Sequence, residues 1–339
     1  MKKKVAVIGS GGWGTAISIL LARCGYEVNL WSYFKEEADR LRQDRENKEF
    51  LPGVMLDEAI SFTSDMEEAV KGVEFIVMVP PSKAVRSVAQ TLCPFVPKGM
   101  IIVNASKGLD QDTLKRLSVT IKEIIPQAEV AVMSGPSHAE EVARGIPTTN
   151  VVAARTLEVA EFVQDAMMCD SFRIYTSLDM AGVELGGALK NCIALCAGML
   201  DGLGLGDNTK AALMTRGMSE IARLGVACGA DVATFSGLSG MGDLIVTCTS
   251  MHSRNRRAGI LIGQGVSPEE AMKQVNMVVE GVHTTKAAYQ LAKRMNVEMP
   301  IVERAYAVLF EGESPKTALE LLMGRSKRHE TEQVVSFIK

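Results

Sequence analysis

A glycine-rich segment near the start of the chain constrains the fold more than any other feature. Residues 5–8 form an apolar run of strand type that ends at residues 9–14, which fit the pattern G-x-G-x-x-G. The residues that follow predict a helix over 15–23, closed by Gly25, and a second strand over 28–31. A strand, a glycine turn, a helix and a strand in this order indicate a βαβ unit that binds a dinucleotide.

Each glycine of the pattern meets a physical requirement. Gly9 allows the tight turn, Gly11 lets the backbone approach a pyrophosphate, and Gly14 lets the helix pack on the strand. The free N–H groups of the first helical turn then face the anion. The alternative is a glycine turn that binds nothing, but a bare fold does not require all three glycines. We therefore expect a cofactor site.

Composition narrows the class of protein. At 339 residues the chain exceeds one ordinary domain and predicts two. Its formal net charge of -3 gives no support to a nucleic-acid partner. The basic residues 2–4 lead straight into a strand rather than into a signal peptide, and the apolar stretch at 192–200 is too short to span a bilayer. We expect no membrane span.

The cysteines indicate reduced thiols. There are seven of them, scattered without C-x-x-C pairs, which suits a cytoplasmic protein. Cys192 and Cys196 lie one helical turn apart. Because no histidine spacing completes four ligands, core packing is favoured over a metal site.

Strands and helices alternate through the first half of the chain. The apolar strand runs after the first two are at 75–79, 100–103, 130–133, 151–154 and 172–175. The segments expected between them are helices at 35–48, 65–71, 83–92, 113–125 and 157–168 and a turn at 51–54. This alternation predicts an α/β fold with a doubly wound, Rossmann-type parallel sheet.

Unusual residues collect where these strands end. They are the glycine loop, Pro80-Pro81, Lys107 and residues 134–137. In doubly wound sheets ligands bind outside the carboxyl ends of the strands. Four strand ends that point to one crevice are stronger evidence of a site than any single one.

From about residue 179 the β-branched strand runs vanish. The helices expected there lie at 183–200, 209–228, 253–262, 268–275, 284–295 and 301–310. We therefore expect a Rossmann cofactor domain over residues 1–177 and an all-helical substrate and catalytic domain over residues 178–335.

Lys190 is the residue of the second domain that most needs an explanation. Its predicted helix is apolar on nearly every side, so the lysine is expected to be buried. A buried ammonium must find a partner or lose its proton, and a lysine with a lowered pKa is a usable general acid or base. The alternative is a lysine at a helix edge that extends its head to solvent.

Two further stretches support a site. Asp243 lies between glycines and an apolar run, as a partner for a buried cation or as a helix cap at a turn. If Ser253 caps a helix, Arg254 and Asn255 lie in its first turn, where an anion is attracted, and arginine offers a planar fork for phosphate. The alternative for this basic run is a solvated face, which we expect for Arg256 and Arg257.

A nicotinamide site with a lysine and a phosphate clamp indicates reduction of a small phosphorylated ketone. Hydride adds to the carbonyl carbon, and the ammonium of Lys190 supplies a proton to the oxygen. In the reverse direction the neutral amine takes the proton from an alcohol.

The motifs together resemble a known family. The matching segments are 9–16, 104–108, 134–139, 185–191, 240–247, 253–257 and 278–281. They are similar to those of the bacterial NAD(P)-dependent glycerol-3-phosphate dehydrogenases, in order from residue 5 to about residue 325. Ser-Arg-Asn-Arg-Arg after Gly-x-Gly-Asp-Leu is specific to that family.

The resemblance implies a reaction and a set of site residues. Dihydroxyacetone phosphate would be reduced reversibly to sn-glycerol 3-phosphate for phospholipid synthesis, by a homodimer that uses NADH or NADPH, with Lys190 as the proton acceptor in oxidation. The residues expected to bind substrate are Lys107, Gly135, Ser137, Lys190, Asp243, Ser253, Arg254 and Asn255. Those expected to bind cofactor are Gly9, Ser10, Gly11, Gly12, Trp13, Gly14, Tyr33, Lys107, Ala139, Arg254, Val278 and Glu280.

Two positions depart from the family pattern. Gly12 stands where serine is common. After the second strand, where the family often carries arginine or histidine, this chain reads Ser32-Tyr33-Phe34-Lys35. No acidic residue ends that strand, although a site for NAD alone usually places one there. These side chains would accept either cofactor, with a small preference for NADPH.

Two other functions compete with this interpretation. A β-hydroxyacid dehydrogenase of the same superfamily would share the glycine loop, the helical domain and the helix lysine, but it would lack the clamp at Arg254 and Asn255. A protein that only senses dinucleotide would have no reason to keep Lys190 and Asp243 beside an anion clamp.

Overall fold

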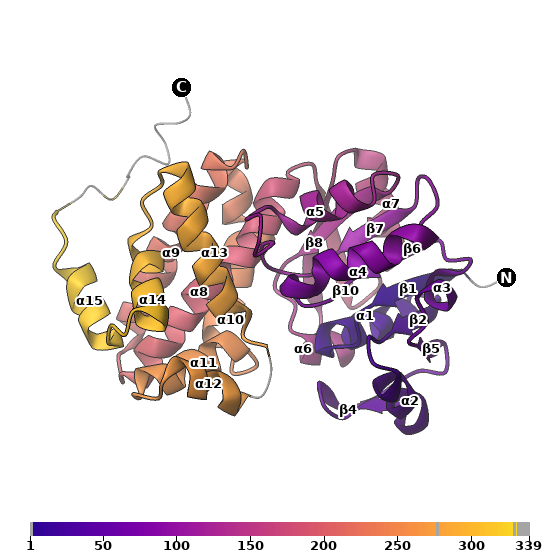
Figure 1. Ribbon diagram of the computed structural model, residues 1–339, viewed down its shortest axis with the longest axis horizontal. Coiled ribbons are helices and arrows are strands. Elements are labelled where there is room, and N and C mark those ends of the chain that lie inside the picture. The colour runs from indigo at the N-terminus through magenta and orange to yellow at the C-terminus, as the bar shows by residue number, and fades with distance from the viewer. Residues whose placement is uncertain (1–2, 276–277, 328–329, 331–339) are drawn as a thin grey trace. The chain divides into compact units, whose positions relative to one another are not determined.

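The chain folds into two compact units. The computed structural model describes residues 3–275, 278–327 and 330. The division falls between Met180 and Ala181. Figure 1 shows a sheet with helices in the first unit and helices alone in the second, which confirms the predicted fold class.

An eight-stranded sheet forms the frame of the first unit. Its strands lie in the order β10-β9-β8-β7-β6-β1-β2-β5. Their bounds are β1 (Lys4–Ile8), β2 (Glu27–Trp31), β5 (Ile60–Thr63), β6 (Phe75–Met78), β7 (Ile101–Asn104), β8 (Glu129–Ser134), β9 (Thr148–Ala154) and β10 (Phe172–Ser177). Neighbouring strands are parallel except β8 and β9, which are antiparallel.

The antiparallel pair departs from the expectation of a wholly parallel sheet, and the connection explains it. Between β8 and β9 lies one five-residue helix, α6 (Ala139–Ala143). Residues 135–147 make the whole connection, near the minimum of about a dozen for a parallel crossover, and its helix covers only about 7 Å of the roughly 20 Å that β8 spans. The chain does not form a full crossover helix here, and β9 runs back beside β8 as its antiparallel neighbour.

Helices cover both faces of the sheet. They are α1 (Gly12–Arg23), α2 (Lys35–Asp44), α3 (Met66–Val70), α4 (Val85–Leu92), α5 (Leu117–Ile124), α6 and α7 (Leu157–Met167). Alternate strand residues enter opposite cores. Val5 and Val7 pack with α1, α2, α6 and α7, and Ala6 and Ile8 pack with α3, α4 and α5. This alternation is the period-two pattern of a sheet that is buried on both faces.

Several local expectations in this unit were wrong. The helix expected at 35–48 ends at Asp44, and strand β3 occupies Glu46–Asn47. The turn expected at 51–54 is a strand, β4 (Leu51–Met55), which pairs with β3 (Glu46–Asn47). Strand β5 was not expected at all. The helix expected at 113–125 starts only at Leu117, because Leu114 has a φ of 59°, a left-handed conformation that a helix does not contain.

The second unit is built around one buried helix. Its helices are α8 (Met180–Gly202), α9 (Asp207–Ala227), α10 (Asp243–Thr249), α11 (Arg254–Gly263), α12 (Pro268–Val275), α13 (Glu280–Met295), α14 (Pro300–Phe310) and α15 (Pro315–Met323). Glycines let α8 and α11 touch: a Cβ on Gly198 would lie 2.1 Å from the carbonyl oxygen of Arg256, and one on Gly259 would lie 2.1 Å from that of Leu195.

The apolar stretch of helix α8 is longer than the run at 192–200 suggested. Among the helices that the structure describes, it is the one long and apolar enough to cross a membrane, and its most apolar 18-residue window is wholly buried within the protein. A helix that is apolar all round fits the centre of a helical core.

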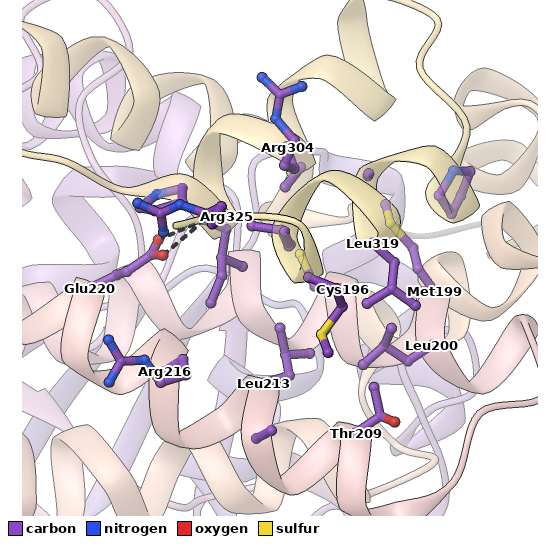
Figure 2. A pocket seen from close by; sticks show the side chains of 18 of the residues that line it. Cys196, Met199, Leu200, Thr209, Leu213, Arg216, Glu220, Arg304, Leu319 and Arg325 are labelled. Carbon is purple, nitrogen blue, oxygen red and sulfur yellow. Dashed lines mark hydrogen bonds between the residues drawn. The ribbon is translucent and has the colours of Figure 1, made fainter. Parts of the chain in front are cut away.

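A cavity of about 460 Å³ lies in this second unit, between α8, α9, α14 and α15. Figure 2 shows its apolar side chains, such as Leu200 and Leu319, with Arg216, Arg304 and Arg325 among the polar residues around it. None of the residues that line it belongs to the predicted site. It is a structural feature of the helical unit, separate from the chemistry considered below.

Glu220, at the wall of this cavity, caps helix α14. Its side chain accepts hydrogen bonds from the N–H of Ile301 at 2.9 and 3.1 Å and from that of Val302 at 3.3 Å. Burial raises the pKa of Glu220 to about 7, although these hydrogen bonds favour the carboxylate. The folded protein therefore holds this proton more tightly than the unfolded chain does.

We predict that Glu220 makes the free energy of unfolding depend on pH. Because the folded pKa is about 7 and the ordinary value is 4.5, the free energy of unfolding should fall as pH rises from about 4.5 to 7. Urea unfolding of the wild type and of Glu220→Gln at several pH values measures this free energy. The difference in the free energy of unfolding between the wild type and the variant should change by up to about 3 kcal/mol over this pH range. A difference that is independent of pH would contradict the assignment.

Candidate active site

The glycine loop is packed tightly against its own fold and open on the other side. Gly9 has a φ of +122°, and a Cβ there would lie 3.0 Å from the carbonyl carbon and oxygen of Val79. A Cβ on Gly14 would lie 1.8 Å from the carbonyl oxygen of Gly9. A Cβ on Gly11 would meet nothing within 4 Å. The backbone at Gly11 therefore has room for a ligand to approach.

The start of helix α1 offers donors to an anion. Gly11 is its N-cap and supplies no side-chain hydrogen bond, and the first turn holds no acidic residue. The indole Nε1 of Trp13 is buried and has no hydrogen-bond partner among the described residues. Because a buried donor without a partner is costly, this N–H suits a ligand atom at the loop.

A short hairpin, β3–β4, holds the loop in place. The side chain of Asn47 donates to the carbonyl oxygen of Ser10 and to Oγ1 of Thr15, each at 2.8 Å. A Cβ on Gly12 would lie 2.7 Å from the carbonyl oxygen of Phe50 in the same hairpin. A larger side chain at Gly12 would therefore require the hairpin to shift. Nothing in the local sequence pattern indicated the hairpin.

An acidic group does lie at the end of β2, contrary to the sequence-based expectation. Glu37, in the first turn of α2, accepts a hydrogen bond from Ser10 Oγ at 2.8 Å and another from Ser32 Oγ at 2.6 Å. The two serine hydroxyls lie 2.9 Å apart. The sequence places this carboxylate five residues beyond Ser32, and only the reversal of the chain into α2 returns it to the strand end.

Three of the predicted substrate residues meet around one carbonyl group. Lys107 Nζ donates to the carbonyl oxygen of Gly135 at 3.1 Å, and Ser137 Oγ donates to the same oxygen at 3.0 Å. A Cβ on Gly135 would lie 2.0 Å from Oδ1 of Asn150, so this position requires glycine. The structure thus joins the ends of β7 and β8 in a polar cluster. The neighbouring Ala139 is half-buried at the start of α6.

In the second unit, Lys190 and Asp243 form a buried ion pair. Their side chains are 6% and 1% exposed, and Lys190 Nζ donates to Oδ1 of Asp243. Lys190 also lies 2.5 Å from Oγ1 of Thr247, which donates to the carbonyl oxygen of Asp243 at 2.6 Å. The lysine therefore does not extend to solvent. A buried pair of this kind persists because each charge has a partner.

The start of α11 is tied to the helix of Lys190. Ser253 is its N-cap and accepts from the N–H of Arg256 at 3.2 Å. Asn255 Nδ2 donates to Oδ1 of Asn191 at 2.9 Å, and its Oδ1 accepts from the N–H of Gly281 at 2.8 Å. Asn255 therefore links the residue after Lys190 to the first turn of α13.

The remaining predicted residues of this unit lie near these helix starts. Glu280 is the first residue of α13, and Val278 lies two residues before it. Both are half-buried, as is Arg254, the first residue of α11. The predicted residues thus gather at strand ends in the first unit and, apart from Lys190 in the middle of α8, at helix starts in the second.

The solvated face expected for Arg256 and Arg257 was wrong. Arg256 Nε bonds to Oδ2 of Asp201 at 2.7 Å, and its NH1 donates to the carbonyl oxygen of Thr249 at 2.6 Å. Nε of Arg257 is buried without a hydrogen-bond partner among the described residues. These partners are distant in the sequence, so a local charge run gave no sign of them.

Burial raises the pKa of both cysteine thiols of α8. Burial raises the pKa of Cys192 to about 12, so its thiol stays protonated near neutral pH. Within residues 3–275, 278–327 and 330, no group of three or more histidine, cysteine, aspartate or glutamate side chains is placed to hold a metal ion.

Comparisons with known proteins give one consistent answer. Family models described as the N-terminus and C-terminus of NAD-dependent glycerol-3-phosphate dehydrogenase match residues 4–160 and 179–320. The chain is 58% identical over 333 residues to glycerol-3-phosphate dehydrogenase (NAD(P)+) of Moorella thermoacetica, covering 98% of this chain and 99% of that protein. It is 54% identical over 329 residues to the enzyme of the same name from Fusobacterium nucleatum, covering 96% and 98%.

A solved structure agrees with the sequence comparisons. The glycerol-3-phosphate dehydrogenase of Coxiella burnetii superposes with a TM-score of 0.93 at 36% identity, covering 96% of this chain and 99% of that one. The family resemblance drawn from the motifs is thereby confirmed.

We predict different effects for alanine at two glycines of the loop. Gly14→Ala should lower the free energy of unfolding by about 2 kcal/mol or more, because its Cβ would collide with the backbone of Gly9. Gly11→Ala should change it by less than about 1 kcal/mol, because the space is open. Urea unfolding of the two variants measures both. Equal decreases in the free energy of unfolding of Gly14→Ala and Gly11→Ala would contradict the tight packing of the loop at Gly14.

Proposed function

This chain belongs to the NAD-dependent glycerol-3-phosphate dehydrogenase family, and we propose that it reduces dihydroxyacetone phosphate to sn-glycerol 3-phosphate. As a member it is an NAD(P)-dependent oxidoreductase. The observation that carries the proposal is the buried pair of Lys190 and Asp243, a proton donor fixed in the helical unit.

The residues of the glycine loop fit a dinucleotide. The open backbone at Gly11, the uncapped start of α1 and the unpartnered Nε1 of Trp13 provide donors for a pyrophosphate. We assign the cofactor to residues 1–177. The residues proposed to hold it are Gly9, Ser10, Gly11, Gly12, Trp13, Gly14, Tyr33, Lys107 and Ala139, with Arg254, Val278 and Glu280 from the helical unit. When bound, the nicotinamide supplies or accepts the hydride.

Lys190 acts as the general acid in reduction and as the general base in oxidation in this proposal. In reduction its ammonium group donates a proton to the substrate oxygen that becomes the C2 hydroxyl. In oxidation the neutral amine accepts that proton. Asp243 balances the charge of the ammonium form, and Thr247, 2.5 Å from Nζ, fixes its direction. A general acid held in one geometry by packing needs little reorganisation during the reaction.

Each unit, taken by itself, holds polar groups that we assign to the substrate. We assign the phosphate to the first turn of α11, where Arg254 supplies a planar guanidinium and Ser253 and Asn255 hold the helix start. The cluster of Lys107, Gly135 and Ser137 supplies further polar contacts. The substrate is therefore selected by its charge as well as by its carbonyl group.

The cellular setting follows from the same assignment. We propose a cytoplasmic homodimer whose product supplies glycerophospholipid synthesis, with residues 178–335 as the substrate and catalytic domain. Residues 276, 277, 328, 329 and 331–335 of that span lie outside those described. Scattered thiols without a disulfide pattern support a reducing compartment.

Loss of the Lys190 ammonium should abolish turnover. Lys190→Met keeps the volume, and Lys190→Met with Asp243→Asn also avoids a lone buried carboxylate. Both should lower kcat for dihydroxyacetone phosphate by about 100- to 10,000-fold and leave the dissociation constant of the cofactor within a few-fold. The exposed Lys286 is a control site, and Lys286→Met should retain the wild-type kcat. A double variant with near-normal kcat would refute the role of Lys190.

Loss of the Arg254 guanidinium should affect substrate far more than cofactor. Arg254→Ala should raise the KM for dihydroxyacetone phosphate at least about tenfold, since a charge-assisted hydrogen bond contributes about 1.5–3 kcal/mol. The KM for the cofactor should change much less. The exposed Arg155 provides the control Arg155→Ala. Equal increases in the two KM values of Arg254→Ala would contradict a phosphate clamp.

A further inference from the structure

The carboxylate of Glu37 lies at the carboxyl end of β2 although no acidic residue belongs to that strand. We infer that Glu37, held by Ser10 and Ser32, makes this enzyme select NADH over NADPH. The inference rests on the proposed function, because it assumes that the glycine loop binds a nicotinamide dinucleotide. It names a specificity-determining residue that lies outside the family motifs of the sequence.

The hydrogen bonds of Glu37 tie it to the expected position of the adenosine ribose. Ser10 belongs to the glycine loop, and its hydroxyl donates to one carboxylate oxygen at 2.8 Å. Ser32 directly follows β2, and its hydroxyl donates to the other oxygen at 2.6 Å. In a dinucleotide-binding βαβ unit the ribose lies between the glycine loop and the end of the second strand. Glu37 bridges those two places.

The serines hold the carboxylate there. Ser10 is 5% exposed and Ser32 is fully buried, so each hydroxyl needs a partner within the protein. Glu37 satisfies both, and each of its oxygens keeps a second acceptor site. The carboxylate is therefore positioned in advance to accept hydrogen bonds from ribose hydroxyls, which reduces the ordering needed on binding.

Charge decides between the two cofactors at such a position. A 2′-phosphate carries about -1.5 to -2 charges near neutral pH, so the carboxylate of Glu37 would repel it, whereas a free 2′-hydroxyl donates to the carboxylate. Lys35, the basic residue nearest in the chain, is exposed, and no ion pair joins it to Glu37 in the described part of the protein. Among the described residues, the carboxylate of Glu37 is therefore not neutralised by an ion pair.

The side chains that follow Ser32 also suit an unphosphorylated adenosine. Tyr33 and Phe34 are 71% and 61% exposed, and their rings meet edge to face with centroids 5.0 Å apart. Exposed aromatic rings beside a ribose position offer apolar surface for an adenine base. Neither side chain carries a positive charge for a phosphate. The small preference for NADPH that the sequence suggested is thus reversed by the position of Glu37.

Equilibrium binding tests this inference apart from turnover. Calorimetric titration of the intact protein with NADH, NADPH, 5′-ADP and 2′,5′-ADP gives the dissociation constants. Wild type should bind NADH at least about tenfold more tightly than NADPH. Glu37→Gln keeps a hydrogen-bond acceptor and removes the charge. In this variant the ratio of the dissociation constant of NADPH to that of NADH should fall about tenfold, mainly because NADPH binds more tightly. A tenfold change corresponds to about 1.4 kcal/mol.

Two further variants distinguish the effect of the Glu37 carboxylate from a change in net charge and from a folding defect. Glu36→Gln removes the same charge from the neighbouring exposed residue of α2, and its ratio should equal that of wild type. Ser32→Ala keeps the Glu37 charge but removes one positioning hydroxyl, so NADH should bind several-fold more weakly and NADPH should remain disfavoured.

The outcomes distinguish this inference from the proposed function. Wild type that binds NADPH as tightly as NADH would overturn the inference alone, as would a Glu37→Gln ratio equal to that of Glu36→Gln. Wild type that binds none of the four nucleotides would overturn both the inference and the dehydrogenase function. Discrimination between 5′-ADP and 2′,5′-ADP that disappears only in Glu37→Gln would confirm it.

Discussion

The packing of the helical unit depends on the buried ion pair between Lys190 and Asp243. Lysine in a long, apolar and buried helix such as α8 is tolerable only if its charge has a partner in the core. Asp243, the first residue of α10, provides that partner, and Thr247 one turn later provides a hydroxyl. The close approach of α11, which glycines permit, brings Asn255 to Asn191, beside this lysine. Packing and chemistry in this unit therefore depend on the same few contacts.

In the first unit, hydrogen bonds from hydroxyl and amide groups, rather than an ion pair, hold the glycine loop in position. Its glycine loop has little side-chain bulk of its own, so neighbouring elements hold it. Asn47 bonds to the loop from the β3–β4 hairpin, and Glu37 bonds to it from α2. Both side chains come from segments outside the βαβ unit. The backbone at Gly11 remains open while its surroundings are fixed, as a site that binds a ligand with little rearrangement requires.

Local sequence patterns predicted much of this protein, and long-range contacts account for what they missed. The glycine loop, the alternation of strands and helices and the cap at Ser253 are short-range features, so the doubly wound sheet, the helical second unit and the start of α11 followed from them. The antiparallel strand β9 depends on the length of a connection, and the partners of Arg256 lie in other helices. Glu37 lies in a stretch that looks like a solvated helix, and only the fold returns it to β2.

The central claim is that the protein reduces a ketone that carries a phosphate group. The direct measurement is the oxidation of NADH and of NADPH by the wild-type protein, followed by absorbance, with dihydroxyacetone phosphate and with unphosphorylated dihydroxyacetone. Rapid oxidation with the phosphorylated ketone, and little or none without the phosphate, is the predicted result. Cofactor that binds but is not oxidised, or equal rates with the two ketones, would contradict the roles given to Lys190 and Arg254.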